Sequence, residues 1–263
     1  VDVVQYHDIQ QEAQRHSLET LFRAIVRTSP VVAALEHDVF VTALGGFVVR
    51  RQGREIDLPE GRPSELIKLL AVRGNHVQLD VVINHLWPDV SRAVGARRLK
   101  NVVNRVRQSM GPESIDRTPG RIGLGSTVHT DLKAFRALLD GDERSVPAAR
   151  QALALYAGPL LELDLYADWV ATEREAIRGR ALAAFRTVLY GDEASAAWAL
   201  QTLRRINPDF EAPYVEVAEM ALRTRDELTL RESVRLGADL CAQLGVTPSP
   251  RLVELLAEVG SLG

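Results

Sequence analysis

The sequence contains a single cysteine, Cys241, which excludes an internal disulfide and a cysteine-rich zinc site. One cysteine among 263 residues is typical of a protein of the reducing cytosol. No apolar run approaches the roughly 18 residues that a membrane helix requires. The N-terminus also lacks the basic-then-apolar order of a signal peptide. We therefore expect a cytoplasmic protein without a membrane partner.

Motifs for common catalytic chemistry are missing as well. The sequence has no GxxxxGK[ST] loop for nucleotide phosphates, and its six histidines lack HExxH spacing. Ser126, His129 and Asp131 are close in sequence, but neighbours along a strand diverge, so they do not predict a catalytic triad. We expect no enzyme activity, no metal site and no cofactor.

The composition that remains, 46% hydrophobic and 25% charged, is typical of a globular protein of one or two domains. Charge is divided unevenly along the chain. Residues 38–135 hold 15 Lys and Arg against 10 Asp and Glu, whereas residues 136–263 hold 14 against 20. A basic block beside an acidic block predicts two domains that face different partners.

Apolar periodicity predicts the elements of the basic part. Residues 39–58 contain alternating stretches broken by glycine turns, which predicts short antiparallel strands. Three helices should follow: one at 62–74, one ending at Trp87 with Asp80 as its N-cap, and one at 91–110. "HVQL" (76–79) could add a short strand, and "SIDRTPGRIGLG" (114–125) predicts a hairpin.

The acidic part consists almost entirely of predicted helices. They are expected at 132–140, 147–157, 168–190, 193–206, 211–224, 228–244 and 249–258. Prolines separate helix pairs at about 40-residue spacing, as in helical-hairpin repeats. The expected fold class is an α+β winged helix-turn-helix domain followed by an all-α TPR-like helical domain.

The helix predicted over 91–110 carries six cationic side chains and no carboxylate. On a helical wheel its apolar arc lies opposite a row of Arg, Asn and Gln side chains, which can make paired hydrogen bonds to guanine and adenine edges in the major groove. The row comprises Arg97, Asn101, Asn104 and Gln108. Four cations flank it, where they would meet phosphates on both groove walls: Arg98, Lys100, Arg105 and Arg107.

The ordinary alternative to a DNA-binding helix is a solvated surface helix. Such a helix normally carries charges of both signs and is stabilised by Glu–Lys pairs, which this helix lacks. The preceding helix and the following basic hairpin instead complete a helix-turn-helix with a wing. We therefore predict base contacts from the Arg-Asn-Gln row. The predicted phosphate contacts are Arg92, Arg98, Lys100, Arg105, Arg107, Arg117 and Arg121.

In several motifs, which occur in the right order, the chain resembles the SARP regulators (Streptomyces antibiotic regulatory proteins). Their OmpR-type winged helix is similar to "LGGFVVRRQGREIDL", "RPSELIKLLAVRGNHVQLDVVINHLWPDVSRAVGARRLKNVVNRVRQSMG" and "IDRTPGRIGLGSTVHTDLKAFRALL". Their bacterial transcriptional activation domain (BTAD) is similar to the region from "ARQALALYAGPLLELDLYADWVATEREAIRGRAL" to "LCAQLGVTPSPRLVELL". The resemblance covers roughly residues 40–258. We accordingly expect a DNA-binding domain at 38–131 and an activation domain at 132–263.

The resemblance implies a transcriptional activator that binds repeated promoter sites and recruits RNA polymerase, partly through the sigma factor. It implies a homodimer, at least on DNA, and association with the nucleoid. The loop that it places near polymerase comprises Trp87, Pro88, Asp89, Val90 and Ser91. One alternative stays open: a TPR-like scaffold whose winged helix docks proteins, which would display apolar anchors in place of the Arg-Asn-Gln row.

Residues 1–37 precede the region of resemblance, and the sequence begins with Val rather than Met. We expect them to be a helical extension or linker from an upstream region. Their apolar positions have helical spacing and would need a surface to cover: Ile9, Leu18, Leu21, Phe22, Ile25 and Val26.

Overall fold

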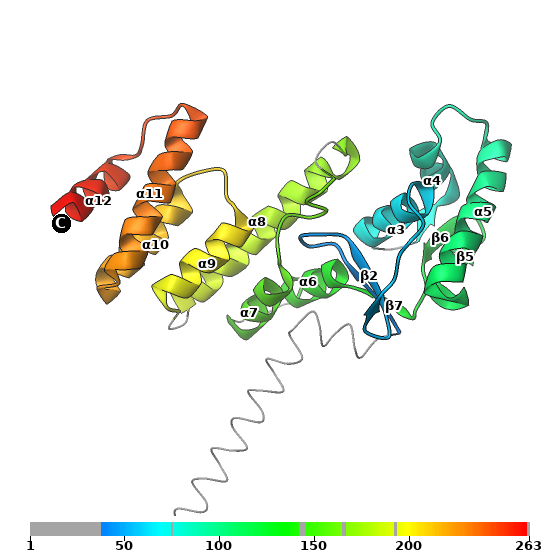
Figure 1. Cartoon of the computed structure of the whole chain (residues 1–263), viewed down its shortest axis with the longest axis horizontal. Helices are drawn as coiled ribbons and strands as arrows, with labels where there is room; N and C mark the ends of the chain where they lie inside the picture. Colours follow the sequence, from blue (N-terminus) through cyan, green and yellow to red (C-terminus); the bar gives the residue numbers. More distant parts are fainter. Residues whose placement is uncertain (1–37, 75, 142–145, 165–166, 192–193, 262–263) are drawn as a thin grey trace, which may run out of the picture. The chain divides into compact units, whose positions relative to one another are not determined.

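The computed structural model describes residues 38–74, 76–141, 146–164, 167–191 and 194–261 (Figure 1). The expectation for residues 1–37 lies outside these ranges. The described chain forms two compact units. Residues 38–42 and 48–133 form the first unit, and residues 43–47 and 134–261 form the second.

A four-stranded sheet opens the first unit. Its strands are β1 (Val39–Thr42), β2 (Val48–Arg51), β3 (Arg54–Glu55) and β7 (Val128–Thr130), in the order β3-β2-β1-β7. The predicted antiparallel pairing of β1 with β2 and of β2 with β3 is confirmed. β7 returns from far along the chain and pairs with β1 in parallel. The buried side chains of Val39, Phe40 and Val41 anchor this sheet in the core.

Three helices and a hairpin complete the first unit, in the predicted order. The helices are α3 (Arg62–Arg73), α4 (Leu79–Leu86) and α5 (Arg92–Met110). A 3-10 turn (Pro112–Ser114) leads into β5 (Ile115–Thr118) and β6 (Arg121–Leu124). β4 (Val77–Gln78) pairs with β6, which gives the second sheet the order β4-β6-β5. Pro63 near the start of α3 and Gly74 in the left-handed conformation at its end mark that helix's limits.

The prediction that Asp80 caps α4 is wrong. The helix begins one residue earlier, at Leu79, and its N-cap is Gln78, whose side chain makes no capping hydrogen bond. The backbone N–H of Leu79 instead donates to the carbonyl of Gly120 at 2.9 Å. The pairing of β4 with β6 therefore continues directly into the helix and leaves no turn for an Asp cap.

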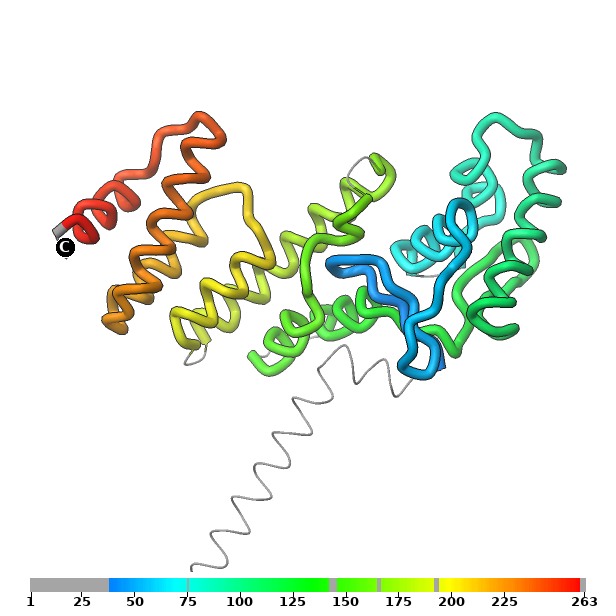
Figure 2. The backbone as a smooth tube through the Cα atoms, viewed as in Figure 1, coloured from blue at the N-terminus to red at the C-terminus, as the bar shows by residue number. Residues whose placement is uncertain are grey.

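The second unit is a series of helices. They are α6 (Asp131–Leu139), α7 (Val146–Leu155), α8 (Asp168–Gly191), α9 (Ala196–Ile206), α10 (Ala212–Thr224), α11 (Glu227–Leu244) and α12 (Pro250–Ser261). From α9 onwards the helices follow one another through short connections (Figure 2). α9 begins at Ala196 rather than at the predicted residue 193, because the Ser195 hydroxyl accepts a hydrogen bond from the N–H of Trp198 at 3.2 Å and caps the helix.

Residues 43–47, which connect β1 to β2, belong to the second unit. Leu44 forms a bridge with Leu160, and the N–H of Leu161 donates to the carbonyl of Ala43 at 2.8 Å. The structure divides the chain between residues 133 and 134, inside α6. The predicted boundary between a DNA-binding domain at 38–131 and an activation domain at 132–263 stays a prediction.

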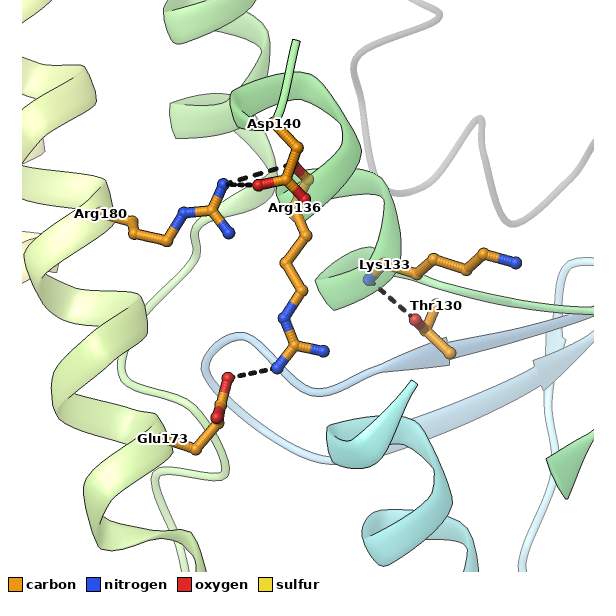
Figure 3. A network of polar contacts seen from close by, with 6 residues as sticks. All are labelled: Thr130, Lys133, Arg136, Asp140, Glu173 and Arg180. Atoms are coloured by element: carbon orange, nitrogen blue, oxygen red, sulfur yellow. Dashed lines mark hydrogen bonds and ion pairs between the residues drawn. The ribbon is translucent and has the colours of Figure 1, made fainter. Parts of the chain in front are cut away.

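Ion pairs tie the helices of the second unit together (Figure 3). Arg136 of α6 pairs with Glu173 of α8, and Arg180 of α8 pairs with Asp140 directly after α6. The start of α6 is capped separately, since the hydroxyl of Thr130 accepts from the N–H of Lys133 at 3.0 Å.

Candidate nucleic-acid interface

The inner face of α5 packs in the core of the first unit, as the helical wheel predicts. Its buried side chains are Leu99, Val102, Val103, Val106 and Met110. Gly95 is buried as well, because α5 passes very close to α4 there. A Cβ atom on Gly95 would lie 2.2 Å from Cγ2 of Ile83. The position of α5 is therefore set by apolar contacts along its whole length.

The opposite face of α5 bears the four predicted base-contacting residues. Arg97, Asn101, Asn104 and Gln108 are all exposed. Their spacing of four, three and four residues keeps them on one side of the helix, over about 16 Å at 1.5 Å per residue. The row is thus long enough to face several consecutive base pairs in a major groove.

The flanking cations fall into two groups. Arg98, Lys100 and Arg105 are exposed, and none of the carboxylates in the described ranges pairs with them. Arg107 is half-buried and donates from Nη2 to the carbonyl of Ile115 at 2.8 Å, so it fastens the end of α5 to β5. Arg107 is thereby less available to a phosphate than the sequence predicts.

Arg92, the first residue of α5, is also engaged. Its Nε lies 2.7 Å from Oδ1 of Asp80 in α4. Sequence reasoning missed this partner because it assigned Asp80 to a helix cap. The only sequence signal for this ion pair was that Asp80 lies in the helix directly before α5, which has no carboxylate of its own.

The wing is the β5–β6 hairpin, which turns at Pro119-Gly120 with φ of +74° at the glycine. Its register places Arg117 opposite Ile122 and Arg121 opposite Thr118. Both arginines are exposed. Because adjacent cross-strand pairs face opposite sides of a hairpin, the two cations lie on different faces of the wing.

The turn between α4 and α5 holds the residues predicted to approach polymerase. Pro88, Asp89 and Ser91 are exposed, whereas Trp87 and Val90 are half-buried. Trp87 and Val90 border a surface pocket of about 230 Å³, together with Asp80, Ile83, Asn84 and Arg92. The pocket beside the turn therefore has a mixed polar and apolar lining.

His85 of α4 gives the first unit a pH-dependent stability. Burial lowers the pKa of His85 below its ordinary 6.5, and Arg62 and Arg73 act in the same direction, whereas Glu65, 3.4 Å away, opposes them. The unfolded chain then binds a proton at higher pH than the folded chain does. We expect stability to fall as pH drops from 6.5 towards the folded pKa.

Chemical unfolding of the full chain between pH 7 and pH 5 measures this effect. His85→Gln should flatten the pH dependence relative to the wild type. An unchanged slope in His85→Gln would contradict the assignment.

Within the described ranges, no group of three His, Cys, Asp or Glu side chains is arranged to hold a metal ion. None of the described helices is long and apolar enough to cross a membrane.

Comparisons with known proteins bear on the fold. No protein-family model matches the chain, and no curated protein matches it. Among solved structures, Mycobacterium tuberculosis EmbR in complex with a low-affinity phosphopeptide is similar, with a TM-score of 0.59 at 17% sequence identity. The match covers 86% of this chain and 66% of EmbR, so the chain spans less than two-thirds of that protein. The shared architecture is a winged helix followed by a helical domain, and the predicted fold class is confirmed.

Proposed function

We propose that the chain is a sequence-specific DNA-binding transcription regulator that inserts α5 into the major groove of promoter DNA. The exposed Arg-Asn-Gln row of α5, on a helix without carboxylates, is the observation that carries this proposal. Apolar packing on the inner face of α5 fixes the position of the row. Direct recognition of base edges requires side chains that are held in position in this way. A protein-docking helix would instead expose apolar anchors at these positions.

The regulator is an activator of the SARP type in this proposal. The first unit binds repeated promoter sites, as a homodimer on DNA, in the nucleoid of the bacterial cytoplasm. The second unit and the turn at residues 87–91 contact RNA polymerase and its sigma factor. The pocket beside Trp87 and Val90, with its mixed polar and apolar lining, is a surface that such a partner could contact. No catalytic step and no cofactor enters this function.

Replacing a residue of the row tests the proposal. We expect Arg97→Ala or Asn101→Ala to cost about 1–3 kcal/mol of binding free energy on the selected site and to relax base preference, because a bidentate contact is lost. In vitro selection from random duplex DNA supplies the site, and competition assays measure discrimination. Arg223→Ala, an exposed arginine of α10, is the matched control and should bind as the wild type does. Full sequence discrimination by both row variants would contradict the proposed role of α5.

A further inference from the structure

The start of α5 has an unusual charge arrangement. The N-terminus of a helix carries a partial positive charge and favours an acid in the first turn. The first turn of α5 has no acid, and its first residue, Arg92, adds a full positive charge. The compensating carboxylate comes from α4, where Asp80 Oδ1 lies 2.7 Å from Nε of Arg92.

Asp80 lies in the first turn of α4, where the partial positive charge of the helix N-terminus interacts favourably with a carboxylate. Both side chains remain open to solvent, with 58% of Asp80 and 77% of Arg92 exposed. The pair borders the surface pocket beside Trp87 and is open to solvent there.

We infer that Asp80 limits the affinity for DNA, because its carboxylate pairs with Arg92, the cation at the start of α5 that would otherwise meet a DNA phosphate. This role rests on the proposed function. The carboxylate neutralises Arg92, so Arg92 contributes no released counterion when DNA binds. An approaching phosphate also meets a like charge at this point.

The consequence is a lower affinity for any duplex. Because phosphate contacts carry no sequence information, a carboxylate at this point weakens specific and non-specific binding alike. Asp80 then sets the strength of binding and not its base preference, and Arg92 is not among the phosphate contacts of the wild-type protein.

Two substitutions and their combination test this role in the full chain. The measurement is fluorescence anisotropy with a random-sequence duplex over a salt titration. Asp80→Asn should tighten binding about two- to tenfold and steepen the slope of log K against log salt by about 0.9. Arg92→Ala alone should weaken binding, because it leaves the Asp80 carboxylate without its partner, and the double variant Asp80→Asn/Arg92→Ala should return to wild-type behaviour.

Asp89→Asn is the matched control. It makes the same charge change at an exposed acid of the turn between α4 and α5, and Asp89 forms no ion pair within the described ranges. A gain in Asp89→Asn equal to that in Asp80→Asn would overturn the role, since net charge would then account for both. A gain that persists in the double variant would overturn it as well. If no variant and no wild-type sample binds duplex DNA, the proposed function itself fails, and the role of Asp80 fails with it.

Discussion

Binding to duplex DNA should weaken about 250- to 1000-fold when salt rises from about 50 to about 200 mM, with log K falling against log salt at a slope of about −4 to −5. The magnitude of this slope is proportional to the number of phosphates that the protein neutralises, with about 0.9 units of slope for each phosphate. Five exposed cations of the first unit are available for this: Arg98, Lys100, Arg105, Arg117 and Arg121. Arg107 and Arg92 are left out of the count because each already has a partner within the protein.

Removing Arg98, Lys100 and Arg105, the exposed flanking cations of α5 that have no carboxylate partner in the described part of the chain, should isolate their share of this slope. The variant Arg98→Ala/Lys100→Ala/Arg105→Ala is expected to lose about 2.7 units of slope and to weaken specific and random duplexes alike. Arg97→Ala is the informative comparison, because it should alter base preference more than the response to salt. Affinity that stays constant between low and moderate salt would remove the electrostatic part of the proposal.

The two faces of α5 could be predicted from the sequence because a single helix obeys one period. Leu99, Val103 and Val106 recur at that period, and the polar row follows from the same geometry on the other side. The helices of the second unit could be predicted for the same reason. Helices and their buried faces can be predicted from local periodicity without knowing which segments pack against them.

The partners of individual side chains could not be predicted, because they depend on segments that are distant in the chain. β7 pairs with β1 across more than 80 residues, and residues 43–47 leave the unit that surrounds them in sequence. Arg107 and Arg92 carry the same charge as Arg98, yet a carbonyl holds one and a carboxylate holds the other. The charge count of α5 therefore needed the tertiary structure, whereas the exposure of the predicted base-contacting row did not.

The closest approach of α4 and α5 makes Gly95 the most sensitive position of the helix-turn-helix. We expect Gly95→Ala to lower the free energy of unfolding of the first unit by about 1–3 kcal/mol, because a new methyl group would lie 2.2 Å from Cγ2 of Ile83. That atom is the branch methyl of a buried residue, so rotation about χ1 cannot easily move it away. Separation of the two helices should also displace α5 and weaken DNA binding at least tenfold, which unfolding and binding measurements on the same sample would detect.

The shape of the Ile83 side chain provides the control. Ile83→Leu removes the branch at Cβ and should restore much of the stability lost in Gly95→Ala, whereas Ile83→Val keeps the branch and should restore none. Gly179→Ala in α8 is the second control, since nothing lies within 4 Å of the added carbon. At that exposed helical position alanine should stabilise the second unit by about 0.5–1 kcal/mol. If Gly95→Ala stabilised the protein as Gly179→Ala does, the tight crossing of α4 and α5 would be refuted.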